Sequence, residues 1–270
     1  MPKAIVEQAG EIIARYLTAA SAESWGYGTD SYYDEQSMFH PMAGALLLRA
    51  HLSMYGVTGD EKYMDWARDV LGRLLDVSSQ FDGGCWGLGF PWRGYPARHC
   101  YAITTAMVGD ALCDAQLVIP DPTIRRSVVS AASWLVEALP WARWRTGSCP
   151  WFACGFPVLA NNVAAKVGLF LLRAGVVTSN KAFTRMGQQG LSFVLANQEA
   201  DGFWSYAVPS RGIDVAAKTE DSLHTAYIVE SLVRAGSLTP RFSWNRRRLS
   251  HAAARGLGFF REFLLGDGRI

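Results

Sequence analysis

The chain repeats itself with a period of about 60 residues. Four leucine-rich helical stretches share one landmark position each, at Arg49, Asp114, Arg173 and Arg234, in steps of 65, 59 and 61 residues. A second set of landmarks, at Leu75, Trp134, Phe193 and Phe259, gives steps of 59, 59 and 66 residues. A unit of this length accommodates two helices and their turns, so the sequence predicts tandem αα-hairpins.

The two helices of each predicted hairpin differ in character. The first helix carries few charges on any side, as in 102–112, which is typical of a helix buried on most faces. The second is amphipathic and charged, as in 61–76 and 123–137, and suits an outer layer. We therefore predict an all-α fold, a single α/α-toroid domain over 1–270. The ring is short or incomplete, with four to five hairpins that include an N-terminal helix over 3–19; an open solenoid of the same hairpins is the alternative.

Composition excludes several classes of protein. The net charge is +2, so the chain lacks the basic excess of a nucleic-acid binder. No apolar run reaches the length of a membrane span. Five cysteines without zinc-ribbon spacing favour reduced thiols, and with them a cytoplasmic location. The oligomeric state stays open.

The connections from outer to inner helices are long, roughly 78–99, 140–159 and 197–219. We call these connections and the inner-helix starts beside them the mouth of the ring. Seven of the ten tryptophans lie in these connections or before the first inner helix: Trp25, Trp86, Trp92, Trp141, Trp144, Trp151 and Trp204. Tryptophans gathered at one end either form a surface that stacks on a ligand or pin long loops to the rim.

A Gln-x-x-x-Gly-x-Trp motif occurs twice, from Gln80 to Trp86 and from Gln198 to Trp204. It resembles the QW repeat of the squalene–hopene cyclase and protein prenyltransferase β-subunit superfamily. The resemblance implies that the glutamine caps a helix end and that the tryptophan stacks on it, which ties neighbouring hairpins together. It implies an α/α toroid and says little about chemistry.

A second resemblance covers most of the chain. The stretch Gly202-Phe-Trp204-Ser-Tyr206, followed by Asp221-Ser-Leu-His224-Thr, is similar to α/α-toroid proteins encoded with bacterial exopolysaccharide and O-antigen genes. The histidine segment also resembles the zinc-binding segment of prenyltransferase β-subunits. The stretch that would supply the other zinc ligands, 160–163, holds neither a thiol nor a carboxylate. We therefore expect no metal and no cofactor.

The same segment supplies the candidate catalytic groups. Asp221 and His224 are three residues apart at the start of a helix, so they share a face. A carboxylate that accepts a hydrogen bond from imidazole fixes its tautomer and prepares it for acid–base catalysis. Tyr227, one turn further, is a second acid or an ordinary core residue. The alternative is that Asp221 only caps its helix.

Polar residues that open the inner helices provide candidate binding groups. His40, His99, Asn161 and Asp221 come first on successive inner helices, where helix dipoles favour anions. The remaining predicted substrate contacts are Trp92, Arg93, Asn162, Trp204, Tyr206 and Asp34. Asp34 would place a second carboxylate across the mouth, although a solvated loop is the alternative there. The residues favour a small-molecule or oligosaccharide substrate that carries a negative charge.

Three functions remain open. The first is a carbohydrate-active enzyme that acts on an acidic sugar or sugar phosphate in bacterial surface-polysaccharide biosynthesis, as a lyase, epimerase or hydrolase with His/Asp acid–base chemistry. The second is an isoprenoid-binding enzyme related to prenyltransferases and terpenoid cyclases. The third is a scaffold without catalysis, whose mouth binds a partner.

Overall fold

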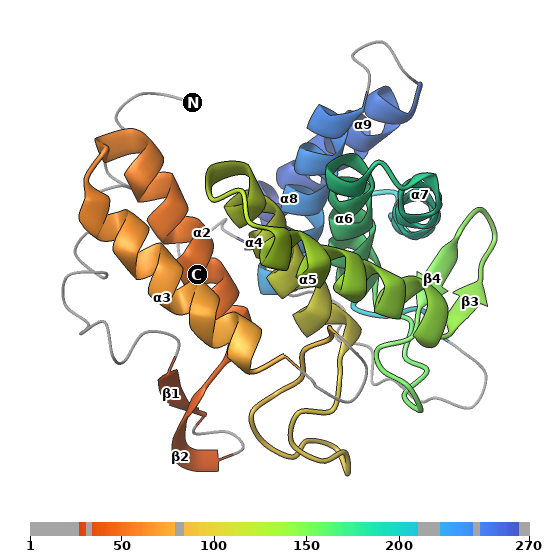
Figure 1. Cartoon of the computed structure of the whole chain (residues 1–270). Coiled ribbons are helices and arrows are strands. Elements are labelled where there is room, and N and C mark those ends of the chain that lie inside the picture. Colours follow the sequence, from red (N-terminus) through yellow and green to blue (C-terminus); the bar gives the residue numbers. More distant parts are fainter. Residues whose placement is uncertain (1–26, 31–33, 79–83, 210–221, 240–243, 265–270) are drawn as a thin grey trace.

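The computed structural model describes residues 27–30, 34–78, 84–209, 222–239 and 244–264. In these ranges four hairpins follow one another along the chain (Figure 1). They are α2 (Pro41–Thr58) with α3 (Glu61–Asp76), α4 (Ala102–Val118) with α5 (Pro122–Ser133), α6 (Asn161–Thr178) with α7 (Lys181–Ala196), and α8 (Ser222–Leu238) with α9 (Trp244–Phe259). Short π-helical segments, η2 (Trp134–Ala138) and η3 (Phe260–Leu264), continue α5 and α9. The helix predicted over 3–19 lies outside the described residues.

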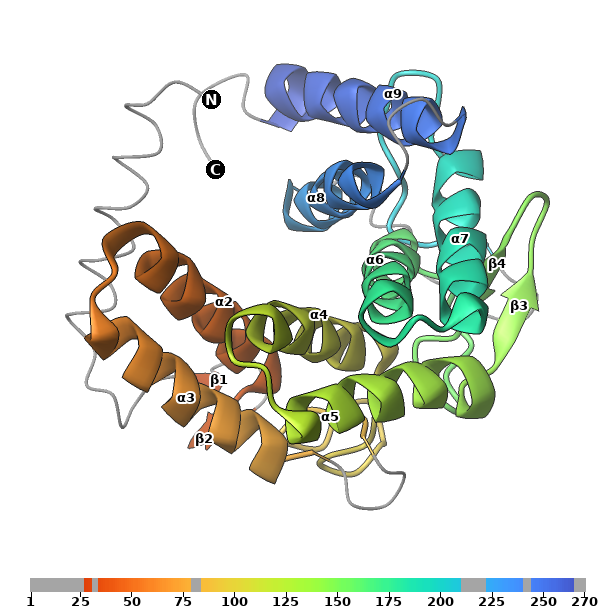
Figure 2. The same ribbon diagram turned by 45° about the horizontal axis from the view of Figure 1, so that its top comes forward.

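The hairpins curve into a ring with two layers (Figure 2). The inner layer is α2, α4, α6 and α8, and each of these helices packs on the next one in that order. The outer layer is α3, α5, α7 and α9, each packed on the inner helix that precedes it in the chain. The predicted α/α toroid is therefore confirmed, with four hairpins in the described part of the chain.

The inner and outer helices start differently. The outer helices α3, α5 and α7 have side-chain caps, because Asp60, Asp121 and Asn180 each accept a hydrogen bond from the backbone N–H two residues further on. The inner helices α2, α4 and α6 have no side-chain cap. Their first backbone N–H groups are thus left to the long loops and to any ligand at the mouth.

All the described strands lie in the long connections, at the end of the ring where the inner helices begin (Figure 1). β1 (Tyr27–Asp30) pairs with β2 (Asp34–Phe39) before α2, and β3 (Trp141–Arg143) pairs with β4 (Ser148–Pro150) before α6. The all-α prediction missed these two antiparallel pairs. They add backbone hydrogen bonds before α2 and before α6, and they place Asp34 in a strand, opposite Asp30.

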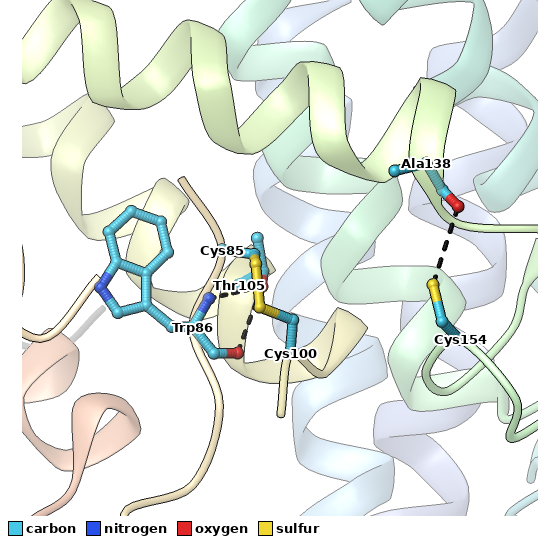
Figure 3. The surroundings of a disulfide bond; sticks show 6 residues. All are labelled: Cys85, Trp86, Cys100, Thr105, Ala138 and Cys154. Atoms are coloured by element: carbon cyan, nitrogen blue, oxygen red, sulfur yellow. Dashed lines mark hydrogen bonds between the residues drawn. A yellow bond between two sulfur atoms is a disulfide. The ribbon is translucent and has the colours of Figure 1, made fainter. Parts of the chain in front are cut away.

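A disulfide joins Cys85 to Cys100 across the connection between α3 and α4 (Figure 3). The expectation of reduced thiols is therefore wrong for Cys85 and Cys100, whereas Cys113, Cys149 and Cys154 form no disulfide within the described residues. Disulfides persist in oxidising compartments, so the expected cytoplasmic location loses this support. Within the described residues, no helix is long and apolar enough to cross a membrane.

Candidate functional site

Three tryptophans of the mouth fasten the long loops to the ends of the outer helices. The indole N–H groups of Trp86, Trp141 and Trp204 donate to the carbonyls of Leu74, Leu135 and Val194 at 2.7, 2.7 and 2.9 Å. These carbonyls lie near helix ends, where backbone N–H partners run short. The Val194 carbonyl also accepts a hydrogen bond from the backbone N–H of Asn197 at 3.2 Å. Trp204 is only 3% exposed, so it has no ring face for a ligand, and its prediction as a substrate contact is wrong.

Gln198 of the second QW motif joins two hairpins. Its Nε2 donates to the carbonyl of Gly202 in its own loop and to the carbonyl of Ala252 in α9, both at 2.9 Å. The tie between neighbouring hairpins that the resemblance implied is therefore present in this repeat. Gln80 of the first motif lies outside the described residues.

Trp92 and Arg93 stand on a tight turn. Trp92 and Tyr95 exchange two backbone hydrogen bonds, of 3.0 and 2.9 Å, around Arg93 and Gly94, whose φ angles of 50° and 83° are both left-handed. A two-residue turn of this kind requires positive φ at both positions, which is unfavourable for arginine. The turn presents the exposed Arg93 guanidinium over the Trp92 ring, 5.0 Å from its centroid.

An aromatic cluster surrounds this turn at the start of α4. Its members come from the first two long loops and the helix start: Trp92, Tyr95, His99, Tyr101, Phe152 and Phe156. His99 stacks on Tyr95 with 4.4 Å between the ring centroids and meets Tyr101 edge-on at 5.5 Å. His99 was predicted to open this inner helix, but the N-cap of α4 is Tyr101, two residues further on. We call these six residues the aromatic cluster.

His224 lies in the first turn of α8, against the third long loop. Its ring meets Tyr206 edge-on, with 4.8 Å between the centroids. Both side chains are half-buried, so both keep surface for a ligand. Asp221, the predicted partner of His224, lies outside the described residues, and their pairing stays a prediction.

Tyr227 lies one turn below His224 and faces charged groups. The Lys166 ammonium is 4.6 Å from the centroid of the Tyr227 ring, and Lys166 also forms an ion pair with Glu230. Burial and the neighbouring Glu230 raise the pKa of Tyr227 above its ordinary value. The hydroxyl therefore stays protonated near neutral pH and is suited to donate a hydrogen bond.

Buried polar atoms without a protein partner gather at the starts of α4 and α6. Within the described residues these are His99 Nε2, Tyr101 OH, Thr104 Oγ1, Asn161 Oδ1 and Asn162 Oδ1. Asn161 does not cap its helix; its Nδ2 holds the third loop by donating to the Ser205 carbonyl at 2.8 Å. Buried polar groups without partners are rare in proteins and call for water or a ligand.

His40 and Asp34 lie at the start of the first inner helix. His40 is the N-cap of α2, and its ring meets Phe90 of the first long loop at 6.0 Å. Asp34 lies in β2, six residues before that cap. In the described part of the chain, no three His, Cys, Asp or Glu side chains come together as a metal site.

An ion network on the ring axis forms the floor of the mouth, and sequence reasoning missed it. Its members come from all four inner helices: Arg49, Asp110, Asp114, Lys166, Arg173, Glu230 and Arg234. Asp110 and Lys166 are the most buried members, each with 4% of the side chain exposed, and Asp110 pairs with Arg173 and Arg234. We call these seven residues the axial network.

The network keeps its members charged. Burial opposes the ionised forms of Asp110 and Glu230, but the neighbouring cations outweigh it and hold the pKa of both carboxyls below their ordinary values. The carboxylates in turn raise the pKa of Arg234, against the effect of burial. Burial lowers the pKa of Lys166 and its pairing with Glu230 opposes the change.

No family model matches the sequence, and no curated protein matches it. The fold matches solved structures. A UGL structure recorded with dGlcA-Glc-Rha-Glc matches with a TM-score of 0.61 and 16% identity, over 83% of this chain and 62% of that one. The cellobiose 2-epimerase from Bacillus thermoamylovorans B4167 matches with a TM-score of 0.65 and 13% identity, over 89% and 67%. An alpha-1,6-mannanase variant of Salegentibacter sp. HEL1_6, in complex with alpha-1,6-mannotetrose, matches with a TM-score of 0.69 and 10% identity, over 94% and 69%.

These likenesses show the fold, and the chain spans less than two thirds of the UGL chain. Two of these structures contain oligosaccharides, and the third is of an enzyme named for a disaccharide, cellobiose. None of the three is a terpenoid cyclase or a prenyltransferase, the families that the QW motif resembles.

Proposed function

We propose that this protein is a carbohydrate-active enzyme that binds an acidic sugar or oligosaccharide at the mouth of the ring. One observation carries the proposal: buried polar atoms lack partners at the starts of α4 and α6, beside the aromatic cluster. A sugar offers hydroxyl groups for such atoms and an apolar ring face for aromatic side chains. The hydrocarbon chain of an isoprenoid forms no hydrogen bonds with these atoms, and only a diphosphate group attached to it could do so.

The charged groups of the mouth account for the acidic character of the substrate. Arg93 is exposed on its turn, and the starts of α4 and α6 carry no side-chain cap, so their backbone N–H groups favour an anion. The similar UGL structure holds an oligosaccharide whose recorded composition begins with dGlcA, which supports an acidic ligand by analogy.

His224 is the proposed proton-transfer group. It keeps exposed surface next to Tyr206, at the border of the region where the partnerless polar atoms gather. Its imidazole would accept a proton from a substrate hydroxyl or from a water molecule. It would then return the proton to the leaving-group oxygen in a hydrolysis, or to the substrate atom that is re-protonated in an epimerisation, with Asp221 orienting the imidazole. Tyr227, which stays protonated, would donate a hydrogen bond. Hydrolysis, epimerisation and elimination all use this transfer. The resemblance to toroids encoded with exopolysaccharide genes supports a role of the reaction in surface-polysaccharide biosynthesis.

The test is a substrate panel with a matched histidine control. The purified chain is incubated with unsaturated glucuronyl oligosaccharides, cellobiose and alpha-1,6-mannotetraose, and the products are followed by mass spectrometry and NMR. Hydrolysis adds the mass of water, whereas epimerisation changes only the NMR spectrum. We expect His224→Asn to lose turnover but to keep sugar binding. His251→Asn, on the exposed side of α9, serves as the control and should keep both.

The other two functions give different results in the same assay. Binding of a prenyl diphosphate in preference to every sugar would support the isoprenoid hypothesis. Sugar binding without turnover by the unaltered chain would support a scaffold. Turnover that survives His224→Asn would remove His224 from the mechanism but leave the sugar assignment in place.

A further inference from the structure

A hollow of about 540 Å³ opens on the other side of the axial network from the mouth. It lies between the middle of α2 and the C-terminal halves of α4 and α8. Its lining residues are Leu46, Arg49, Ala50, Leu52, Ser53, Asp114, Leu117, Val118 and Arg234. The volume falls in the range of pockets that hold small molecules. The axial network separates this hollow from His224 and the aromatic cluster.

The walls of the hollow are apolar and exposed. Leu46, Leu117 and Val118 are 45%, 72% and 43% exposed, although they belong to the inner layer of the ring. Most other apolar residues of α4 are buried. An apolar wall with a few fixed polar groups at its base is the usual composition of a small-molecule site.

The base of the hollow carries unused hydrogen-bond donors. Arginine has five N–H donors. Arg49 donates three hydrogen bonds, one to Asp114 and two to Glu230. Arg234 also donates three, two to Asp110 and one to Glu230. Each guanidinium therefore keeps two N–H groups without a hydrogen bond in the described part of the chain. The remaining ion-pair contacts are longer: Arg49 Nη1 lies 3.7 Å from Asp110 Oδ2, and Arg234 Nη2 lies 3.8 Å from Asp114 Oδ2.

The charges of the axial network do not balance. It holds four cations, Arg49, Lys166, Arg173 and Arg234, and three carboxylates, Asp110, Asp114 and Glu230. The two arginines that line the hollow are the more exposed ones, with 26% and 23% of their side chains accessible, against 10% for Arg173. The charged lining of the hollow is therefore two guanidinium groups and one carboxylate, Asp114, whose side chain is 30% exposed, which leaves the lining with one positive charge in excess. Asp114, which also lines it, is already paired with Arg49 and Arg173.

We propose that the hollow is a second binding site, for a small organic oxyanion. Its carboxylate or phosphate group would pair with Arg49 and Arg234, and its apolar part would contact Leu46, Leu117 and Val118. Guanidinium groups bind both oxyanions through paired N–H donors, so the shared chemistry is the anionic group with an apolar tail. The site stands apart from the mouth and does not depend on the function proposed there.

The test measures binding of three six-carbon probes by isothermal titration calorimetry at constant ionic strength. The probes are hexanoate, hexyl phosphate and the neutral hexan-1-ol. We expect at least one of the two anions to bind about tenfold or more tightly than hexan-1-ol, and the tighter anion identifies the preferred group. Equal affinity for all three probes, or binding of hexan-1-ol alone, would overturn the proposal.

Three variants locate the binding, and two of them, Leu117→Trp and Val176→Trp, leave the ion pairs of the axial network in place. Leu117→Trp fills the hollow from an exposed position and should weaken anion binding about tenfold. Val176→Trp, at a similarly exposed position of α6 outside the hollow, is its control and should leave affinity unchanged. Arg49→Lys keeps the charge but loses the paired donors, so it should weaken binding as well. Anion binding that Leu117→Trp leaves intact would place the site elsewhere and refute the assignment.

Discussion

Arg49 of α2 and Glu230 of α8 are 181 residues apart in the sequence, and the guanidinium nitrogens of Arg49 lie 3.3 Å from Glu230 Oε1. These helices are the first and last inner helices of the described ring, and Figure 2 shows them at the two ends of the curved row of inner helices. The ion pair therefore joins the two ends of the repeat array. The axial network stabilises the curvature of a ring that has only four described hairpins.

Asp110→Asn is expected to lower the free energy of unfolding by about 3–5 kcal/mol, because it leaves buried guanidinium charges without their carboxylate. Asp110 is the central acceptor of the network and pairs with both Arg173 and Arg234. Urea denaturation measures the change. Asp65→Asn is the control: its pair with Arg68 is exposed on both sides, so the expected loss is below about 1 kcal/mol. Equal losses in the two variants would mean that the axial network does not stabilise the ring.

The sequence predicted the ring from the same residues that build the network. Arg49, Asp114, Arg173 and Arg234 served only as landmarks of the repeat, yet equivalent positions on the inner helices of a ring face one axis. The available signal was a charged residue at each landmark of an otherwise apolar helix. Opposite charges at equivalent positions predict a central ion network once a toroid is assumed.

Other features of the site could not be read from the sequence. The pairing of Cys85 with Cys100 and the strands β1 to β4 depend on the path of the long loops, and loop paths follow from contacts that lie far apart in the chain. Trp204 and Trp92 looked alike in the sequence, but one is buried on a helix end and the other is half-exposed on a turn. The difference arises from which loop carbonyls and helix ends come together.

Trp141→Phe is expected to lower the free energy of unfolding by about 1–3 kcal/mol. The Leu135 carbonyl loses its hydrogen-bond donor, while the phenyl ring of phenylalanine keeps an aromatic side chain at the position. Trp86→Phe should give a loss of the same order through Leu74. Chemical denaturation of both variants, followed by circular dichroism, measures these losses. Similar losses of unfolding free energy would show that Trp141 fastens the hairpin that lacks a QW glutamine in the same way as Trp86 fastens its own hairpin. No loss in Trp141→Phe would contradict this.

His51 is expected to make the protein less stable as the pH falls from about 6.5 to 4. Burial lowers the pKa of His51 from 6.5 to about 4, so the folded state resists a proton that the unfolded state accepts. Its contribution is complete above pH 6.5 and is lost as the pH falls to 4, by about 3 kcal/mol in all at 1.36 kcal/mol per unit. Unfolding free energies measured across this range check the slope. His51→Gln, which does not titrate, should flatten it, and an unchanged slope in that variant would assign the pH dependence to other groups.

Reduction of the disulfide is expected to loosen the mouth before it unfolds the ring. The Cys85–Cys100 bond closes a loop of 15 residues, for which the loss of chain entropy in the unfolded state is worth about 3 kcal/mol. That loop carries Trp92 and Arg93, so Cys85→Ser should lower the melting temperature and speed proteolysis between the two positions. Cys154→Ser is the control: it removes a thiol that forms no disulfide and lies 3.7 Å from the Ala138 carbonyl, and it should change neither the melting temperature nor the rate of proteolysis.

Because the Trp86 backbone also bonds to Thr105 and the Trp86 indole to Leu74, the helices should keep their circular dichroism signal in the reduced protein. Loss of the helical signal at the same reductant concentration that exposes the loop would show that the disulfide is needed by the whole ring.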